Sequence, residues 1–250
     1  MSKTASRAPD LPADASPRSA VRKPIGPSLQ IGLGVLLTAI AGCVDAIGFI
    51  ALGGFFASFM SGASLSLGVA ASAGHWDGIY ETVRVIAAFL AGTIVATVMA
   101  GVTGVWALSI VLSLEAGLLA GAALLAAAGW PDSVAILPVV AAMGVQNTAL
   151  RPVNGMRLGA TFMTGTLVSF GQGIGTALLG QGRPWSWSPH AILWGAFTAG
   201  AAAGGALYVA FGFMAVSGPA ALVAVTAALV LVMVFFGNRS RRMDGSNGPA

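Results

Sequence analysis

Hydrophobic residues follow one another along most of this chain in long runs, separated by short breaks that are polar or rich in Gly and Pro. A membrane-spanning helix needs about 20 mostly apolar residues, and several runs come close to that length. They are Gln30–Leu52, Phe55–Ala73, Thr82–Gly101, Trp106–Ala128, Ser133–Leu150, Leu158–Leu179, His190–Gly212 and Val216–Phe236. The pattern predicts an all-α fold, a polytopic transmembrane helical bundle of about eight spans. The breaks at Gly53-Gly54 and Gly101–Gly104 are short, so six or seven spans are the alternatives.

Composition supports a membrane solvent. Of the 250 residues 56% are hydrophobic and only 8% are charged, whereas soluble domains carry about 25% charged residues. So few charges could not cover the surface of a water-soluble protein of this size. The 35 glycines also fit membrane helices, where small residues let backbones approach closely. The lipid bilayer is therefore the first partner that the sequence predicts.

The basic residues lie mainly at the two ends of the chain. Of the 12 Lys and Arg residues, five precede residue 24 and three follow residue 238. This placement fits the positive-inside rule with both termini cytoplasmic, as an even number of spans requires, and it argues against nucleic-acid binding. We expect a multi-pass protein of the bacterial inner membrane. Its expected parts are a disordered tail at 1–28, a transmembrane domain at 29–237 and a basic tail at 238–250.

Three short motifs occur twice, in the same order. Their copies lie 102, 103 and 108 residues apart and are Gly42-x-x-Asp45 with Gly144-x-x-Asn147, Phe59-Met60-Ser61-Gly62 with Phe162-Met163-Thr164-Gly165, and Phe89-x-Ala91-Gly92 with Phe197-x-Ala199-Gly200. Repeats of this kind indicate a duplicated architecture. We expect repeat one at about 30–128 and repeat two at about 133–236. Four spans in each half would give both halves the same orientation.

The repeated motifs place polar residues at one expected depth. Asp45 lies eight residues before Gly53 and Ser61 lies eight after it, so both should lie roughly 12 Å below that turn. Corresponding positions in the second half give Asn147 and Thr164, with Gln146 beside them. The glycines that follow the two hydroxyl residues could break their helices and free backbone groups for a ligand. The predicted substrate-binding set is Asp45, Ser61, Gly62, Gln146, Asn147, Thr164 and Gly165. Each of these residues also has a purely structural interpretation as an interhelical hydrogen-bonding group.

Two acids lie within predicted spans, Asp45 and Glu115. An acid near the bilayer centre costs at least about 2.5 kcal/mol, so both should face protein or water. Both are predicted ion-coupling groups, and Glu115 could pair with Arg84 if packing brings their depths together. Arg151 and Arg157 flank the fifth and sixth spans on the other side, where they could attract an anion at the mouth of the site.

No pattern of catalytic residues is present, so an enzyme is not expected. His75 and His190 lack a nearby second ligand, and neither a metal site nor a cofactor is predicted. Gly171-Gln172-Gly173 lies inside an apolar run rather than after a strand, which argues against a phosphate loop. It belongs with the small-residue faces that we expect between packed helices. These are Gly117-x-x-x-Gly121, Gly171-x-x-x-Gly175 and Gly200-x-x-x-Gly204.

The assembled motifs resemble those of the YoaK-like family, bacterial membrane proteins classed as a domain of unknown function. The matching segments are Ala41–Ala46, Phe59–Gly62, Met143–Asn147 and Phe162–Leu167, within a resemblance that covers approximately Gln30 to Phe236. Two departures are Ala63, where an Asn is expected after Ser-Gly-, and Cys43, where a bulkier residue is common. The resemblance implies a membrane location and a repeat architecture.

Two functions compete. The first is a secondary carrier of a small solute coupled to a proton, because repeated halves that meet near the bilayer midplane are a common carrier design. The second is a scaffold or sensor that does not transport and partners another protein, favoured by the small-residue faces. Homo-oligomerisation is compatible with both.

Overall fold

This computed structural model describes residues 27–54, 56–149 and 162–246, and it places side chains for residues 28–54, 56–149 and 162–237. Over these ranges the chain forms α-helices and short 3₁₀ helices and no strand, which confirms the predicted all-α class. In chain order the elements are α1 (Pro27–Ala51), α2 (Met60–Ser72), α3 (Trp76–Thr103), η1 (Gly104–Trp106), α4 (Ala107–Ala127), α5 (Asp132–Ala149), α6 (Met163–Leu178), α7 (Ser188–Phe211), η3 (Gly212–Val216) and α8 (Ser217–Ser246).

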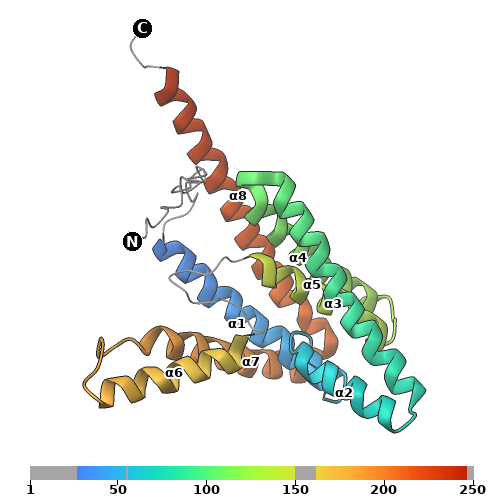
Figure 1. Ribbon diagram of the computed structural model, residues 1–250. Coiled ribbons are helices and arrows are strands. Elements are labelled where there is room, and N and C mark those ends of the chain that lie inside the picture. The colour runs from blue at the N-terminus through green and yellow to red at the C-terminus, as the bar shows by residue number, and fades with distance from the viewer. Residues whose placement is uncertain (1–26, 55, 150–161, 247–250) are drawn as a thin grey trace, which may run out of the picture.

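Two helices are longer than the hydrophobic pattern predicted. α3 begins at Trp76 and includes most of the polar break at 74–81 between the second and third predicted spans. Asp77 lies in its first turn, where a carboxylate interacts favourably with the helix dipole. α8 continues to Ser246 and therefore extends into the predicted C-terminal tail. Figure 1 shows its end projecting beyond the other helices.

Two helices are shorter than predicted. α2 has 13 residues and α6 has 16, which correspond to roughly 20 and 24 Å of helix. Neither length crosses the hydrocarbon core of a bilayer, which is about 30 Å thick. Within the described residues, three longer helical stretches meet the length and hydropathy of a membrane span, namely Ser28–Ala51, Trp76–Ala127 and Ser188–Gly237. The last two each contain two helices joined by a 3₁₀ turn, α3 with α4 and α7 with α8.

Each of these two joints, the 3₁₀ turns η1 and η3, begins at a glycine. Gly104 has φ 56° and ψ −117°, and Gly212 has φ 59° and ψ −147°. A residue with a Cβ rarely adopts this backbone conformation, whereas glycine does so readily. Each glycine ends one long helix and begins the 3₁₀ turn that leads into the next. The predicted break at Gly101–Gly104 is therefore a change of helix direction at Gly104.

The closest helix contacts cross between the two halves of the chain. α1 packs along α7, and α3 packs along α5. In the first pair, a Cβ on Gly42 would overlap the carbonyl oxygen of Phe197, and a Cβ on Gly200 would overlap that of Ala39. A Cβ on Gly204 would likewise overlap the Cys43 carbonyl oxygen, so the predicted face Gly200-x-x-x-Gly204 is a contact face.

The second pair uses the matching positions. A Cβ on Gly144 of α5 would overlap the carbonyl oxygen of Phe89 in α3, and a Cβ on Gly92 of α3 would overlap that of Ala141 in α5. Both pairs therefore bring backbones together without side chains between them, as small residues allow in membrane helices. The other two predicted faces differ, because a Cβ at Gly117, Gly121, Gly171 or Gly175 meets nothing within 4 Å in the described chain.

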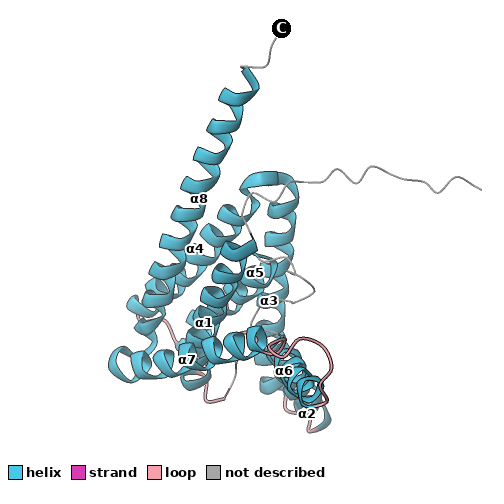
Figure 2. Ribbon diagram, turned by 90° about the vertical axis from the view of Figure 1, so that its left-hand side faces the viewer, coloured by secondary structure: helices cyan, strands magenta, loops and turns pink. Residues whose placement is uncertain are grey.

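The helices form an upright group and a transverse group. Figure 2 shows α1, α3, α4, α5 and α8 roughly side by side, with α2, α6 and α7 gathered at their lower end. The hydrophobic core lies mainly among the upright helices, where Val44, Leu112, Leu119, Val140 and Met143 are essentially inaccessible. α4 packs extensively on both α5 and α8, whereas α1 makes far fewer contacts with α5 and α8 than with α7.

Candidate functional site

Asp45 anchors the segment that precedes α2. Its side chain is 2% exposed, and it lies on the part of α1 that faces this segment. Oδ1 accepts a hydrogen bond of 2.7 Å from the backbone N–H of Ser58, and Oδ2 accepts one from the Ser58 hydroxyl. Ser58 is fully buried. The carboxyl group therefore satisfies a backbone group that no helix satisfies, just before α2 begins at Met60.

Asp45 was expected to lie at one depth with Ser61, and the structure pairs it with Ser58 instead. Ser61 and Gly62 lie in the first turn of α2 and are exposed. No side chain caps this turn. Ser61 and Gly62 are therefore accessible at the start of a short helix. The buried Asp45 instead contacts Ser58, three residues before Ser61.

The second half places its polar residues differently. The Asn147 amide is partly buried and donates a 2.7 Å hydrogen bond from Nδ2 to the Met143 carbonyl in its own helix. Thr164 and Gly165 are exposed in the first turn of α6, which also lacks a side-chain cap. In Figure 1, α6 and α2 extend to opposite sides of the lower part of the molecule, and each begins toward its centre. The two repeated Phe-Met-Ser/Thr-Gly motifs thus occupy corresponding places.

Glu115 and Gln146 form a second buried polar contact. Gln146 of α5 donates from Nε2 to Glu115 Oε1 of α4 at 3.0 Å and to the Leu37 carbonyl of α1 at 3.1 Å. Glu115 is 0% exposed and Gln146 is 7% exposed. This one amide therefore joins three helices. Gln146 was predicted to contact substrate together with Asn147, and the structure gives it a helix-joining contact with Glu115.

The structure does not bring Glu115 and Arg84 together, which was the condition for their pairing. Arg84 forms a salt bridge of 2.9 Å with Glu81, one turn earlier in α3, and lies over the Tyr80 ring. Its second guanidinium nitrogen contacts the Ser133 carbonyl at 3.4 Å. Arg84 is near the start of α3, and these neighbours hold it there. Glu115 lies in the middle of α4, which follows the other end of α3.

The predicted mouth residues Arg151 and Arg157 lie outside the described residues.

Ser58 was not among the predicted site residues, although the repeated motif in the sequence points to it. The repeated motif extends by two residues, since Ala57-Ser58 precedes Phe59-Met60 as Ala160-Thr161 precedes Phe162-Met163. A hydroxyl residue shared by both copies directly before the short helices was the clue.

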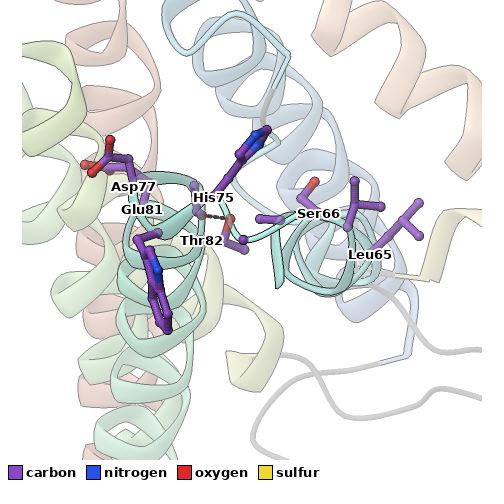
Figure 3. A pocket seen from close by; sticks show the side chains of 11 residues that line it. Leu65, Ser66, His75, Asp77, Glu81 and Thr82 are labelled. Carbon is purple, nitrogen blue, oxygen red and sulfur yellow. Dashed lines mark hydrogen bonds between the residues drawn. The ribbon is translucent and has the colours of Figure 1, made fainter. Parts of the chain in front are cut away.

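The structure also has a pocket of about 980 Å³ that the sequence did not predict. It lies between the end of α2 and the start of α3 (Figure 3). Leu65 and Ser66 line it from α2, whereas Asp77, Glu81 and Thr82 line it from α3. Figure 3 shows Asp77 and Glu81 on the far side of α3 from Leu65. None of the predicted site residues lines this pocket.

Comparison with known proteins gives the family. The sequence model of the family described as "Protein of unknown function (DUF1275)" matches residues 33–229. The chain belongs to the DUF1275 family. The match agrees closely with the extent predicted for the YoaK-like resemblance.

Two relatives of the chain carry the words "transmembrane protein" in their names. The chain is 33% identical over 140 residues to the UPF0700 transmembrane protein YoaK of Bacillus subtilis (strain 168), a match that spans 54% of this chain and 62% of that relative. It is 32% identical over 188 residues to the UPF0700 transmembrane protein RA0705 of Rhizobium meliloti (strain 1021), over 72% of this chain and 76% of that relative. No solved structure matches. Together with the apolar helices, these names show an integral membrane protein.

Proposed function

We propose that this DUF1275 protein is a secondary carrier of a small solute in the bacterial inner membrane, with both termini cytoplasmic. Its polar site lies where two related halves meet. The observation that carries this proposal is the buried carboxyl of Asp45, which fixes the chain directly before the short helix α2. An acid at such a position in an apolar helix is costly, and carriers use interrupted helices to present backbone groups to a solute.

The arrangement of the helices supports a duplication. The order of three α-helices, a 3₁₀ helix and a fourth α-helix occurs twice, as α1 to α4 and as α5 to α8. The first helix of each half packs on the third helix of the other. The glycines of both contacts belong to motifs that the sequence repeats, Gly42 with Gly144 and Gly92 with Gly200.

The proposed solute site comprises the first turns of α2 and α6. Ser61, Gly62, Thr164 and Gly165 are exposed there, and the hydroxyl groups of Ser61 and Thr164 can donate hydrogen bonds to a solute or accept them from it. Asp45 acts as a positioning residue, because its contacts are with Ser58 rather than with the open turn. Asn147 and Gln146 belong to the surrounding polar framework.

A thermal-shift screen of the purified protein against a metabolite library, at two pH values, tests the proposal. A solute that stabilises the protein should lose its effect in Ser61→Ala and Thr164→Val and show a weaker effect in Asp45→Asn. Ser72→Ala is the matched control, since Ser72 is exposed at the other end of α2 and bonds only to the Val69 carbonyl. Uptake of that solute by proteoliposomes should follow the same order. Equal uptake by the wild type and all three site variants would contradict the proposed site.

A scaffold or sensor that partners another protein is the second candidate. The faces of Gly117 and Gly121 and of Gly171 and Gly175 favour it, because nothing within the described chain packs against them. Co-purification of one partner in fixed stoichiometry, with no stabilising solute in the screen, would support this candidate over the carrier.

A further inference from the structure

Glu115 has one carboxyl oxygen with a partner and one without. Oε1 accepts the 3.0 Å hydrogen bond from Gln146. Oε2 is buried and has no hydrogen-bond partner among the described residues. Buried polar atoms in folded proteins are paired in the great majority of cases, so an unpaired carboxyl oxygen inside the helical core requires an explanation.

No cation compensates this carboxyl group in the described chain. The elements packed against α4 are α3, α5, α8, η1 and η3, and α1 reaches it through Gln146. Their titratable residues with described side chains are Asp77, Tyr80, Glu81 and Arg84 at the start of α3, Asp132 at the start of α5, and Cys43 and Asp45 of α1. None of them bonds to Glu115, and the Arg84 guanidinium is engaged by Glu81.

The two charge states of Glu115 therefore differ greatly in cost. An ionised carboxylate would leave an uncompensated negative charge in an apolar interior, which is far more costly than an unpaired neutral group. A neutral carboxylic acid leaves only one hydroxyl without an acceptor. The packed arrangement of α4 and α5 consequently favours the protonated acid, in which Oε1 is the carbonyl oxygen that accepts from Gln146.

Gln146 extends this dependence to α1. Its amide nitrogen has two hydrogens, and they go to Glu115 of α4 and to the Leu37 carbonyl of α1. α1 otherwise packs chiefly along α7 and makes few contacts with α5. The Gln146 amide is thus a polar link between the α1–α7 pair and the helices around α4.

We propose that Glu115 is a proton-binding site whose occupancy keeps α1 joined to α4 and α5 through Gln146. Release of the proton to water leaves a carboxylate that must be solvated, and solvation requires the contact between α1, α5 and α4 to open. This site is independent of Asp45. It rests on the proposed function only in its consequence, since in a carrier this site would couple the proton to the movement of α1.

Infrared spectroscopy of the full-length protein in lipid nanodiscs tests directly whether the Glu115 carboxyl is protonated. A protonated carboxyl group has a C=O stretching band distinct from that of a carboxylate. We expect a protonated band near neutral pH that disappears in Glu115→Gln and persists in Asp45→Asn, the matched variant of the other buried acid. A band that survives in Glu115→Gln would overturn the proposal.

Glu115→Asp provides a second test if Glu115→Gln does not fold. The shorter acid changes the hydrogen bond to Gln146, so the position of the protonated band should shift. A band at an unchanged position in Glu115→Asp would assign it to another group and overturn the proposal in the same way.

Spin labels test the coupled opening. Cysteines replace Ile31 of α1 and Leu124 of α4, both exposed, in a Cys43→Ala background that removes the native thiol. We expect the label-to-label distance to lengthen as the protonated band is lost with rising pH, and to stay constant with pH in Glu115→Gln. A distance that never changes while the band titrates would refute the coupling. Neither experiment needs a transported solute, so failure of the carrier proposal would show separately, in the uptake measurements.

Discussion

Helices α1 and α5 stand at corresponding places in the two halves of the chain, and each packs on the third helix of the other half. Both contact surfaces contain a matching glycine, with Gly42 against Phe197 and Gly144 against Phe89. Their polar residues do not agree. α1 carries the acid Asp45, whereas α5 carries Asn147 at the matching place in the motif.

The fourth helices show the same difference. α4 and α8 pack on each other, and their buried positions recur at the same spacing. Leu112, Glu115, Ala116, Leu119 and Ala123 match Val223, Thr226, Ala227, Val230 and Val234. Glu115 thus corresponds to Thr226, whose hydroxyl only bonds to the Leu222 carbonyl of its own helix. The two halves share a framework of backbone contacts, while both buried acids belong to the first half.

The close backbone contacts are shared by the two halves, whereas the buried polar side chains are not. Close backbone contacts tolerate no added atoms, so they constrain both halves of the chain alike. The polar groups buried in the core differ between the two halves.

Substitution of Gly200 by Ala should have the largest effect. The added methyl would overlap the Ala39 backbone, and backbone cannot move away as a flexible side chain can. We expect the free energy of unfolding to fall by about 3 kcal/mol, the upper part of the usual overpacking range. Gly92→Ala in the other crossed contact should cost a similar amount. Unfolding in mixed detergent micelles measures both values.

Gly117→Ala is the control for that experiment, because nothing lies within 4 Å of its added methyl. It should change stability by less than about 1 kcal/mol, with a contribution in its favour from helix propensity. Equal losses in Gly117→Ala and Gly200→Ala would contradict the crossed contacts.

The two fourth helices should respond unequally to truncation. Glu115→Ala removes a buried side chain and leaves a Gln146 hydrogen without its acceptor, so we expect a loss of about 2 kcal/mol. Thr226→Ala removes a hydroxyl that bonds within its own helix, and it should cost about 1 kcal/mol. Equal costs would show that Glu115 makes no special contribution to the core.

The joints between the third and fourth helices should respond equally. Gly104→Ala and Gly212→Ala each force a residue with a Cβ into a conformation with positive φ, at a cost of about 1–3 kcal/mol. Chemical denaturation of the two variants under one set of conditions checks this expectation. A joint that tolerates Ala without loss would contradict the backbone described for that half.

The smallest effect separates two serines of the first half. Ser58→Ala removes the hydroxyl that donates to Asp45 and should lower stability by about 1–2 kcal/mol. Ser61→Ala, in the exposed first turn of α2, should change it by less than about 0.5 kcal/mol. The reverse order would contradict Ser58 as the partner of Asp45.

The all-α class, the order of the helices along the chain and the identity of the buried acids were predictable from the sequence. Long apolar runs have few alternatives to helix in a bilayer, because each backbone N–H and C=O needs a partner within its own segment. The acids were equally evident, since any carboxyl in such a run must face protein or water. The repeated glycine motifs were visible as well.

Only the tertiary structure decided which hydrogen-bond partner each buried acid has and how deep it lies. Ser58 rather than Ser61 meets Asp45 because α2 begins at Met60, and the hydrophobic pattern does not mark that boundary within an apolar run. Gln146 rather than Arg84 meets Glu115 because α4 packs on α5 with this register. A hydrogen bond depends on positions within a few tenths of an ångström, whereas hydropathy places a residue only to within a helical turn. The sequence therefore determined which groups need partners, and the packing of the helices determined which partners they have.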